Sequence, residues 1–251
     1  MSTKEQRRQK KLAKKRSKEV AKRKEMAREK NSLRSLTGQM KAASGGPVDQ
    51  CLMSARLFDP DAKFGSVYLS RRMRDGRLAV IKLMVDGFCL GVKNVVAFVC
   101  FPADQSRILE DISQAEPMQA VSPAKARKFV EGAIAFAQQF KIDPAADYRK
   151  VAPIWGDIDP RECEEEFAFG DHEGKPRFVN GPYDSLHFQQ QVCEKLHTHA
   201  GEGQYEVIRM MSSDELDLDD SDERGDWVDD PELDADIDED VVDGRAVPRS
   251  D

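Results

Sequence analysis

The chain of 251 residues has no long apolar run, and this absence excludes two classes of protein. Its longest apolar segment, "VVAFVCF" from Val95 to Phe101, is far shorter than the roughly 20 residues that a membrane-spanning helix needs. The basic first residues are not followed by the apolar segment of a signal peptide. The sequence therefore predicts neither a membrane span nor secretion.

Paired-cysteine motifs are also absent. The five cysteines form no CxxC pair and are odd in number, at Cys51, Cys89, Cys100, Cys163 and Cys193. A disulfide framework would be a poor fit to this spacing, whereas free thiols in a reducing compartment suit it well. We therefore expect a cytoplasmic protein.

Charge is plentiful, but its two signs are separated along the chain. Residues 1–44 carry 16 Lys and Arg against four Glu, a net charge of +12, whereas residues 212–251 carry 18 Asp and Glu against three Arg, a net charge of −15. Such segments cannot bury enough apolar surface to offset their ordering entropy. We predict a basic arm over residues 1–45 that is helical only when a partner neutralises its charge, and a disordered acidic tail over 212–251. Between them, residues 46–211 form one globular domain that starts at a hinge, Ala42 to Pro47.

The first half of this domain has strand signals. "GSVYLSRRM" and "RLAVIKLMV" flank Arg74, Asp75 and Gly76, and an Asp-Gly pair between β-rich segments predicts a hairpin. A third strand is expected within Val92–Phe101, and its nearly continuous apolar character predicts burial on both faces.

The second half has helix signals. "SPAKARKFVEGAIAFAQQF" places Ser122 as N-cap, Pro123 at the first helical position and apolar residues at helical spacing. We also expect a short helix over residues 144–151, a hairpin over 166–179, a last helix within 181–201 and an edge strand within 204–210. The predicted fold class is α+β, a single domain with an antiparallel-rich sheet and about three packed helices.

The segment "DGFCLGVKN", Asp86 to Asn94, is close to a phosphate-binding loop but lacks its spacing. Three residues separate Gly87 from Gly91, Asn94 replaces the metal-binding hydroxyl, and a strand follows where a helix is needed. A turn between strands is therefore the favoured interpretation. Asp86, Cys89 and Lys93 remain catalytic candidates, because Lys93 could lower the pKa of the thiol while Asp86 would raise it.

Metal and cofactor sites are not expected. Cys193 and His197 lie four residues apart in the last predicted helix and could supply half of a zinc site, but no further ligands complete it. The acidic loop "WGDIDPRECEEE" has no calcium-loop pattern and favours a solvated turn.

Five segments between Pro47 and Ser185 occur in a distinctive order: "RRMRDGRLAVIKLMVDGFCLGVKN", "EGAIAFAQQF", "DPAADY", "GDIDPRECEEEFAFG" and "GKPRFVNGPYDS". In this order they resemble a family of uncharacterised bacterial proteins with a Lys-rich amino terminus. The resemblance implies a single bacterial α+β domain and no assigned activity. Ile142 and Ala145 depart from the Gly-Phe and Pro-His pairs of the family.

The charge pattern predicts a binding protein. A dense set of cations displaces counterions from phosphates and gives salt-sensitive affinity without sequence preference, so RNA or a ribonucleoprotein is the expected partner. The arm has no aromatic residue for base stacking. The cations expected to bind are Arg7, Arg8, Lys10, Lys11, Lys14, Lys15, Arg16, Lys18, Lys22, Arg23 and Lys24.

Two alternatives remain open. One is an enzyme of unknown reaction with a site near Asp86, Cys89 and Lys93. The other is an assembly protein that acts through its charged ends, with a protein partner for the acidic tail. The tail could also pair with the arm and mask it until nucleic acid competes.

Overall fold

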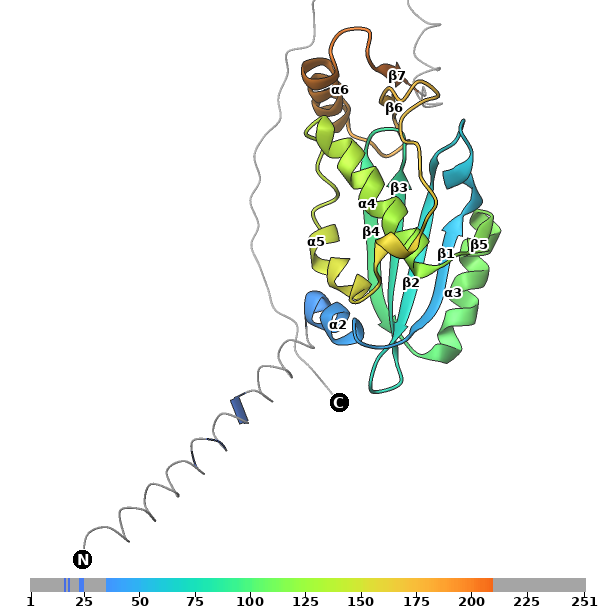
Figure 1. The fold of residues 1–251 in the computed structure, drawn as a ribbon, viewed down its shortest axis with the longest axis vertical. Coiled ribbons are helices and arrows are strands. Elements are labelled where there is room, and N and C mark those ends of the chain that lie inside the picture. Colours follow the sequence, from blue (N-terminus) through green and yellow to red (C-terminus); the bar gives the residue numbers. More distant parts are fainter. Residues whose placement is uncertain (1–15, 17, 19–22, 25–34, 210–251) are drawn as a thin grey trace, which may run out of the picture. The chain divides into compact units, whose positions relative to one another are not determined.

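The computed structural model describes residues 16, 18, 23–24 and 35–209, and a five-stranded sheet lies at its centre (Figure 1). All neighbouring strands are antiparallel, in the order β4-β3-β2-β1-β5. The strands are β1 (Val48–Ser54), β2 (Phe64–Arg72), β3 (Leu78–Asp86), β4 (Gly91–Cys100) and β5 (Met118–Ala120).

The hairpin predicted around Asp75 and Gly76 is confirmed. Strands β2 and β3 pair from Arg72 opposite Leu78 to Phe64 opposite Asp86. Gly76 has a φ of +84°, which a residue without a Cβ adopts at little cost, and Asp75 accepts a hydrogen bond from the backbone N–H of Arg77.

The third predicted strand is present as β4, but the expectation that both of its faces are buried is wrong. β4 is an edge strand, and beyond Val92 none of its residues is buried. Val95, Ala97 and Val99 pack against the main core, whereas Val96 on the opposite face is 48% exposed. An apolar run does not show how many faces of a strand its neighbours cover.

Helix α4 (Pro123–Gln139) covers one face of the sheet and confirms the strongest helix prediction (Figure 1). Its N-cap residue Ser122 accepts a hydrogen bond from the N–H of Lys125 at 3.2 Å. Phe129, Val130 and Ala133 of α4 belong to the main hydrophobic core, which they share with the buried side chains of β2 and β3.

Helix α2 (Leu36–Ala43) packs into the same core, which corrects the predicted hinge. Ser35 caps its N-terminus, and Met40 and Ala43 are fully buried. Packed structure therefore begins before residue 46, inside the range assigned to the arm. Two short helices also pack on this face of the sheet. Helix α5 (Tyr148–Val151) lies where a short helix was expected, and the 3-10 helix Ala152–Trp155 follows it and buries Ile154 and Trp155.

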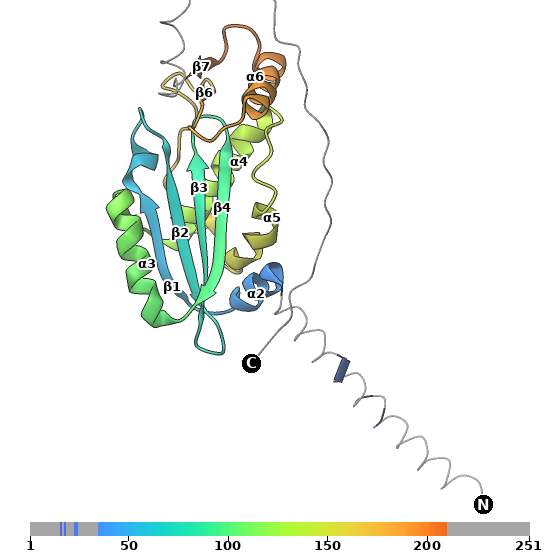
Figure 2. The same cartoon turned by 180° about the vertical axis from the view of Figure 1, so that it is seen from behind.

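Helix α3 (Pro102–Ala115) lies on the opposite face of the sheet (Figure 2) and was not predicted. Ile112 packs there with Tyr68, Leu78 and Val80. Strands β1 and β5 were also not predicted.

The end of the sheet that carries the β3–β4 turn is covered by α6 (Leu186–Ala200) and by the short strands β6 (Arg177–Val179) and β7 (Glu206–Ile208). The predicted last helix and edge strand are confirmed. The hairpin predicted over residues 166–179 is wrong: the turn Asp171–Gly174 forms, but β6 pairs in parallel with β7 and residues 166–170 form no strand.

The α+β class is confirmed, with five α-helices in residues 35–209 where about three were expected. Among the described residues, no helix is both long enough and apolar enough to cross a membrane. The predicted acidic tail, residues 212–251, lies outside the described residues.

Candidate functional site

Only four of the eleven arm cations lie within the described residues. Arg16, Lys18, Arg23 and Lys24 are helical and exposed. The remaining seven lie outside the described residues: Arg7, Arg8, Lys10, Lys11, Lys14, Lys15 and Lys22.

Asp86 organises the β3–β4 turn. Its Oδ1 atom accepts hydrogen bonds from the backbone N–H groups of Phe88 at 2.7 Å and Cys89 at 3.0 Å. Burial raises the pKa of this carboxyl, while the same backbone hydrogen bonds act in the opposite direction. These contacts give Asp86 a structural role in shaping the turn.

Cys89 is fully buried between this turn and the cluster around α6. Burial and the nearby Asp86 raise the pKa of its thiol well above 9.0. A nucleophile needs an accessible thiolate, so both observations argue against catalysis by Cys89.

Lys93 forms an ion pair with a residue outside the β3–β4 turn. Its Nζ atom forms an ion pair with Oδ2 of Asp184 at 2.6 Å and lies 6.0 Å from the ring centroid of Phe64. Lys93 also lowers the pKa of Asp86 and of Cys89, as expected for the thiol, but burial has the larger effect and raises both. The structure thus brings all three candidates within electrostatic reach, and it ties Lys93 to the loop that precedes α6.

Cys193 and His197 share one face of α6, as predicted from their spacing. The Nδ1 atom of His197 lies 3.5 Å from the hydroxyl oxygen of Tyr205. Within the described residues, no three His, Cys, Asp or Glu side chains gather closely enough to hold a metal ion. All five cysteines are free, as expected from their number and spacing.

The acidic loop after Trp155 is held by basic side chains of the domain, and its carboxylates do not converge. Four of them form ion pairs: Asp157 with Arg71, Asp159 with Arg161, Glu165 with Lys125 and Glu166 with Lys128. This agrees with the solvated turn that was expected.

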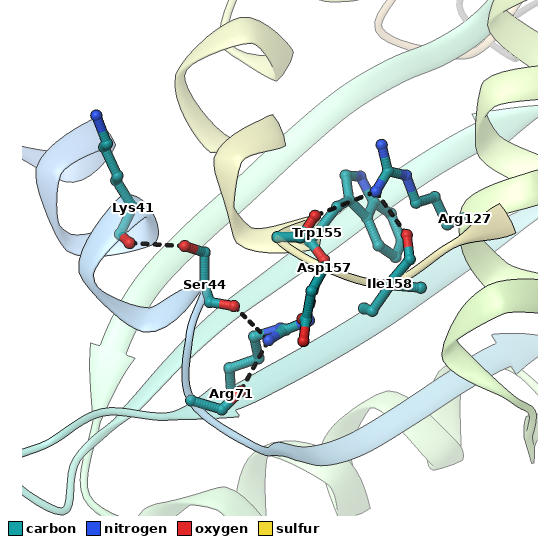
Figure 3. A network of polar contacts seen from close by, with 9 residues as sticks. Lys41, Ser44, Arg71, Arg127, Trp155, Asp157 and Ile158 are labelled. Atoms are coloured by element: carbon teal, nitrogen blue, oxygen red, sulfur yellow. Dashed lines mark hydrogen bonds and ion pairs between the residues drawn. The ribbon is translucent and has the colours of Figure 1, made fainter.

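Arg71 is a buried cation that the sequence did not reveal (Figure 3). Its Nη1 atom donates to the carbonyl oxygens of Ser44 and Gly46, and its Nη2 atom donates to the carbonyl of Trp155 at 2.9 Å and to Asp157 at 3.0 Å. One guanidinium therefore joins β2 to the loop after α2 and to the loop after the 3-10 helix. A cation also suits the C-terminal end of a helix, where carbonyl oxygens lack partners.

Arg127 of α4 holds the same loop from the other side (Figure 3). It donates to the carbonyl oxygens of Ile158 at 2.6 Å and Gly156 at 3.4 Å. The two arginines fix the backbone of residues 155–158 against the sheet.

Lys63 is a second buried cation that the sequence did not reveal. Its Nζ atom donates to the carbonyl oxygens of Ala168 at 3.2 Å and Gly170 at 2.7 Å. Burial lowers its pKa. These bonds fasten residues 168–170 to the start of β2, so they account for the buried charge without a catalytic role.

A cavity of about 460 Å³ lies between the C-terminal end of α2 and the β2–β3 turn. Its lining contains three cations, one carboxylate and no aromatic residue: Lys41, Ala42, Ser44, Gly45, Gly46, Arg72, Met73, Arg74 and Asp75. Among the described residues, Arg72 pairs with Asp49 and Asp75 with Arg77, whereas Lys41 and Arg74 have no ion-pair partner. The cavity therefore carries an excess of positive charge.

The sequence does contain a signal for this cavity, the four arginines of "RRMRDGR" around the hairpin turn. Because side chains alternate along a strand, Arg71 lies on the face of the sheet that packs against α2 and α4, and Arg72 lies on the opposite face. The contribution of Lys41 could not be foreseen, because α2 was placed in the arm.

Comparisons of the chain with protein-family models, curated proteins and solved structures found no match in any of the three. The resemblance to a family of uncharacterised bacterial proteins therefore stays a prediction.

Proposed function

We propose that this chain is a non-enzymatic, cytoplasmic binding protein that contacts nucleic acid, either RNA or a ribonucleoprotein, through its basic arm. The observation that carries the proposal is the net charge of +12 over residues 1–44. Cations at this density release condensed counterions when they meet phosphates, which gives affinity without sequence preference.

Two features of the domain support this function over an enzyme. The candidate thiol, Cys89, is buried and its pKa is raised, so the main catalytic alternative loses its nucleophile. Helix α2, at the end of the range assigned to the arm, lines a cavity with excess positive charge. This cationic surface shares Lys41 with residues 1–44, which is consistent with one extended phosphate-binding region.

The test replaces the eleven arm cations named above with Gln in the full-length chain. Gln has a helix propensity close to those of Lys and Arg, so the change removes charge and preserves the tendency to form a helix. We expect affinity for a single-stranded RNA of about 20 nucleotides to fall more than roughly a hundredfold at low salt, because most phosphate contacts are lost. Fluorescence anisotropy with a labelled RNA measures this change.

A matched control replaces the four glutamates of the same segment, Glu5, Glu19, Glu25 and Glu29, with Gln. Binding should be retained or tightened, since these substitutions remove like charge to the phosphates. Equal affinity of the arm-neutralised variant and the wild type would refute the proposal. Copurification from lysate with and without nuclease adds a second readout: a protein partner that survives nuclease would favour the assembly alternative instead.

A further inference from the structure

The loop Ser44–Gly46 lines the cationic cavity, and two of its carbonyl oxygens accept hydrogen bonds from within the chain. Arg71 donates to the carbonyl of Ser44 (Figure 3). Arg71 also donates to the carbonyl of Gly46, and the N–H of Gly46 donates to the carbonyl of Ala43 at 2.8 Å. The Ser44 hydroxyl donates to the carbonyl of Lys41 at 2.8 Å. The carbonyl oxygens of Lys41, Ala43, Ser44 and Gly46 thus have donors within the chain, which reduces the repulsion that the C-terminal end of a helix exerts on an anion.

The position of this loop is fixed by close packing. A Cβ atom at position 46 would overlap the backbone carbonyl of Arg72, so only Gly allows the loop to lie against the end of β2. Gly45 differs, because a Cβ there would meet nothing within 4 Å and its φ is one that other residues adopt. Position 45 is thus exposed, borders the cavity and tolerates a side chain.

The charged side chains of the lining leave a net charge of +2, from Lys41, Arg72 and Arg74 against Asp75. The neighbouring pairs do not change this balance, because Asp49 and Arg77 carry opposite charges. The volume of about 460 Å³ lies within the ordinary range of ligand pockets.

We propose that this cavity binds a phosphate group of the nucleic-acid backbone, an inference that rests on the proposed function. Guanidinium and ammonium groups suit phosphate oxygens, and the lining has no aromatic ring on which a base could stack. The site therefore contacts the backbone and reads no sequence. Because the cavity and the arm belong to one chain, binding at one raises the effective concentration of the strand at the other.

Gly45→Glu tests the site directly, and Gly45→Gln is its control. The two side chains have nearly the same size, and the open space at position 45 accepts either, so only the carboxylate distinguishes them. In the full-length protein, inorganic phosphate at constant ionic strength should shift the amide NMR signals of Gly45 and Gly46 saturably for the wild type and the Gln variant. The Glu variant should show no saturable shift and should bind RNA roughly tenfold more weakly, because like charges then face each other.

A second pair of variants keeps the backbone unchanged. Arg74→Gln removes a cavity cation, and Arg107→Gln removes an exposed arginine of α3. Only the first should weaken RNA binding and the phosphate-induced shifts.

The outcomes separate this inference from the proposed function. Loss of RNA binding on arm neutralisation, with no effect of Gly45→Glu and no saturable phosphate shift, would overturn the cavity proposal and leave the arm proposal standing. Saturable phosphate shifts without any binding of RNA to the wild type would refute nucleic acid as the source and point to free phosphate. Reduced RNA binding by Gly45→Glu, with normal binding by Gly45→Gln, would support both.

Discussion

At the scale of single residues, Asp86 and Cys89 show how environment decides what a chemically capable side chain does. The spacing of "DGFCLGVKN" was enough to predict a turn and to dismiss a phosphate loop. The spacing could not reveal that the turn is buried, because the side chains that bury it belong to α6 and β6, about 90 residues later in the chain. Burial turns a potential nucleophile into a packing residue with a raised thiol pKa.

We predict that Cys89 reacts with iodoacetamide far more slowly than free cysteine in the native protein, at both pH 7 and pH 9. Burial raises the pKa of this thiol, which disfavours the reactive thiolate, and the side chain is fully buried and so inaccessible to the reagent. Cys193, which is partly exposed on α6, serves as the internal control. Peptide mass spectrometry after timed alkylation gives both rates, and a Cys89 that reacts as fast as Cys193 would revive the enzyme alternative.

At the scale of elements, local sequence signals were enough to predict α4 and the β2–β3 hairpin, but not α2 or α3. Helix α4 has a capping serine, Pro at its first position and a broad apolar stripe, and the β2–β3 hairpin has Asp-Gly at its turn, so both could be predicted. Helix α2 has only eight residues, contains Gly38 and follows a basic segment, and its order comes from packing against the core. Helix α3 begins at Pro102, and its N-cap residue, Phe101, has no side-chain group that could accept a capping hydrogen bond.

Arg71 links α2 to the rest of the fold, so we expect Arg71→Met to lower the free energy of unfolding by about 3 kcal/mol, because buried carbonyl oxygens lose their donor. The neighbouring Arg72→Met removes an arginine whose side chain is 45% exposed, and it should cost less than about 1 kcal/mol. Urea denaturation of both variants provides the comparison. Equal losses would contradict the role assigned to Arg71.

At the scale of the whole molecule, the separation of charge is the property that the sequence states most clearly. A net charge of +12 at one end and −15 at the other leaves about −4 for the residues between them. The fold adds a cationic cavity built from residues about 30 positions apart, which no local pattern could have assembled. Fold class followed from local signals, whereas the cavity depended on tertiary contacts that bring α2 to the β2–β3 turn.

The salt dependence of RNA binding tests the central claim most directly. Each arm cation that contacts a single-stranded phosphate contributes about −0.7 to the slope of log K against log salt concentration, so eleven contacts would contribute about −8. We predict that the full-length wild type has a slope steeper by at least about 3 than the arm-neutralised variant, measured by anisotropy at several salt concentrations. Equal slopes for the two proteins would contradict binding of nucleic acid through the basic arm.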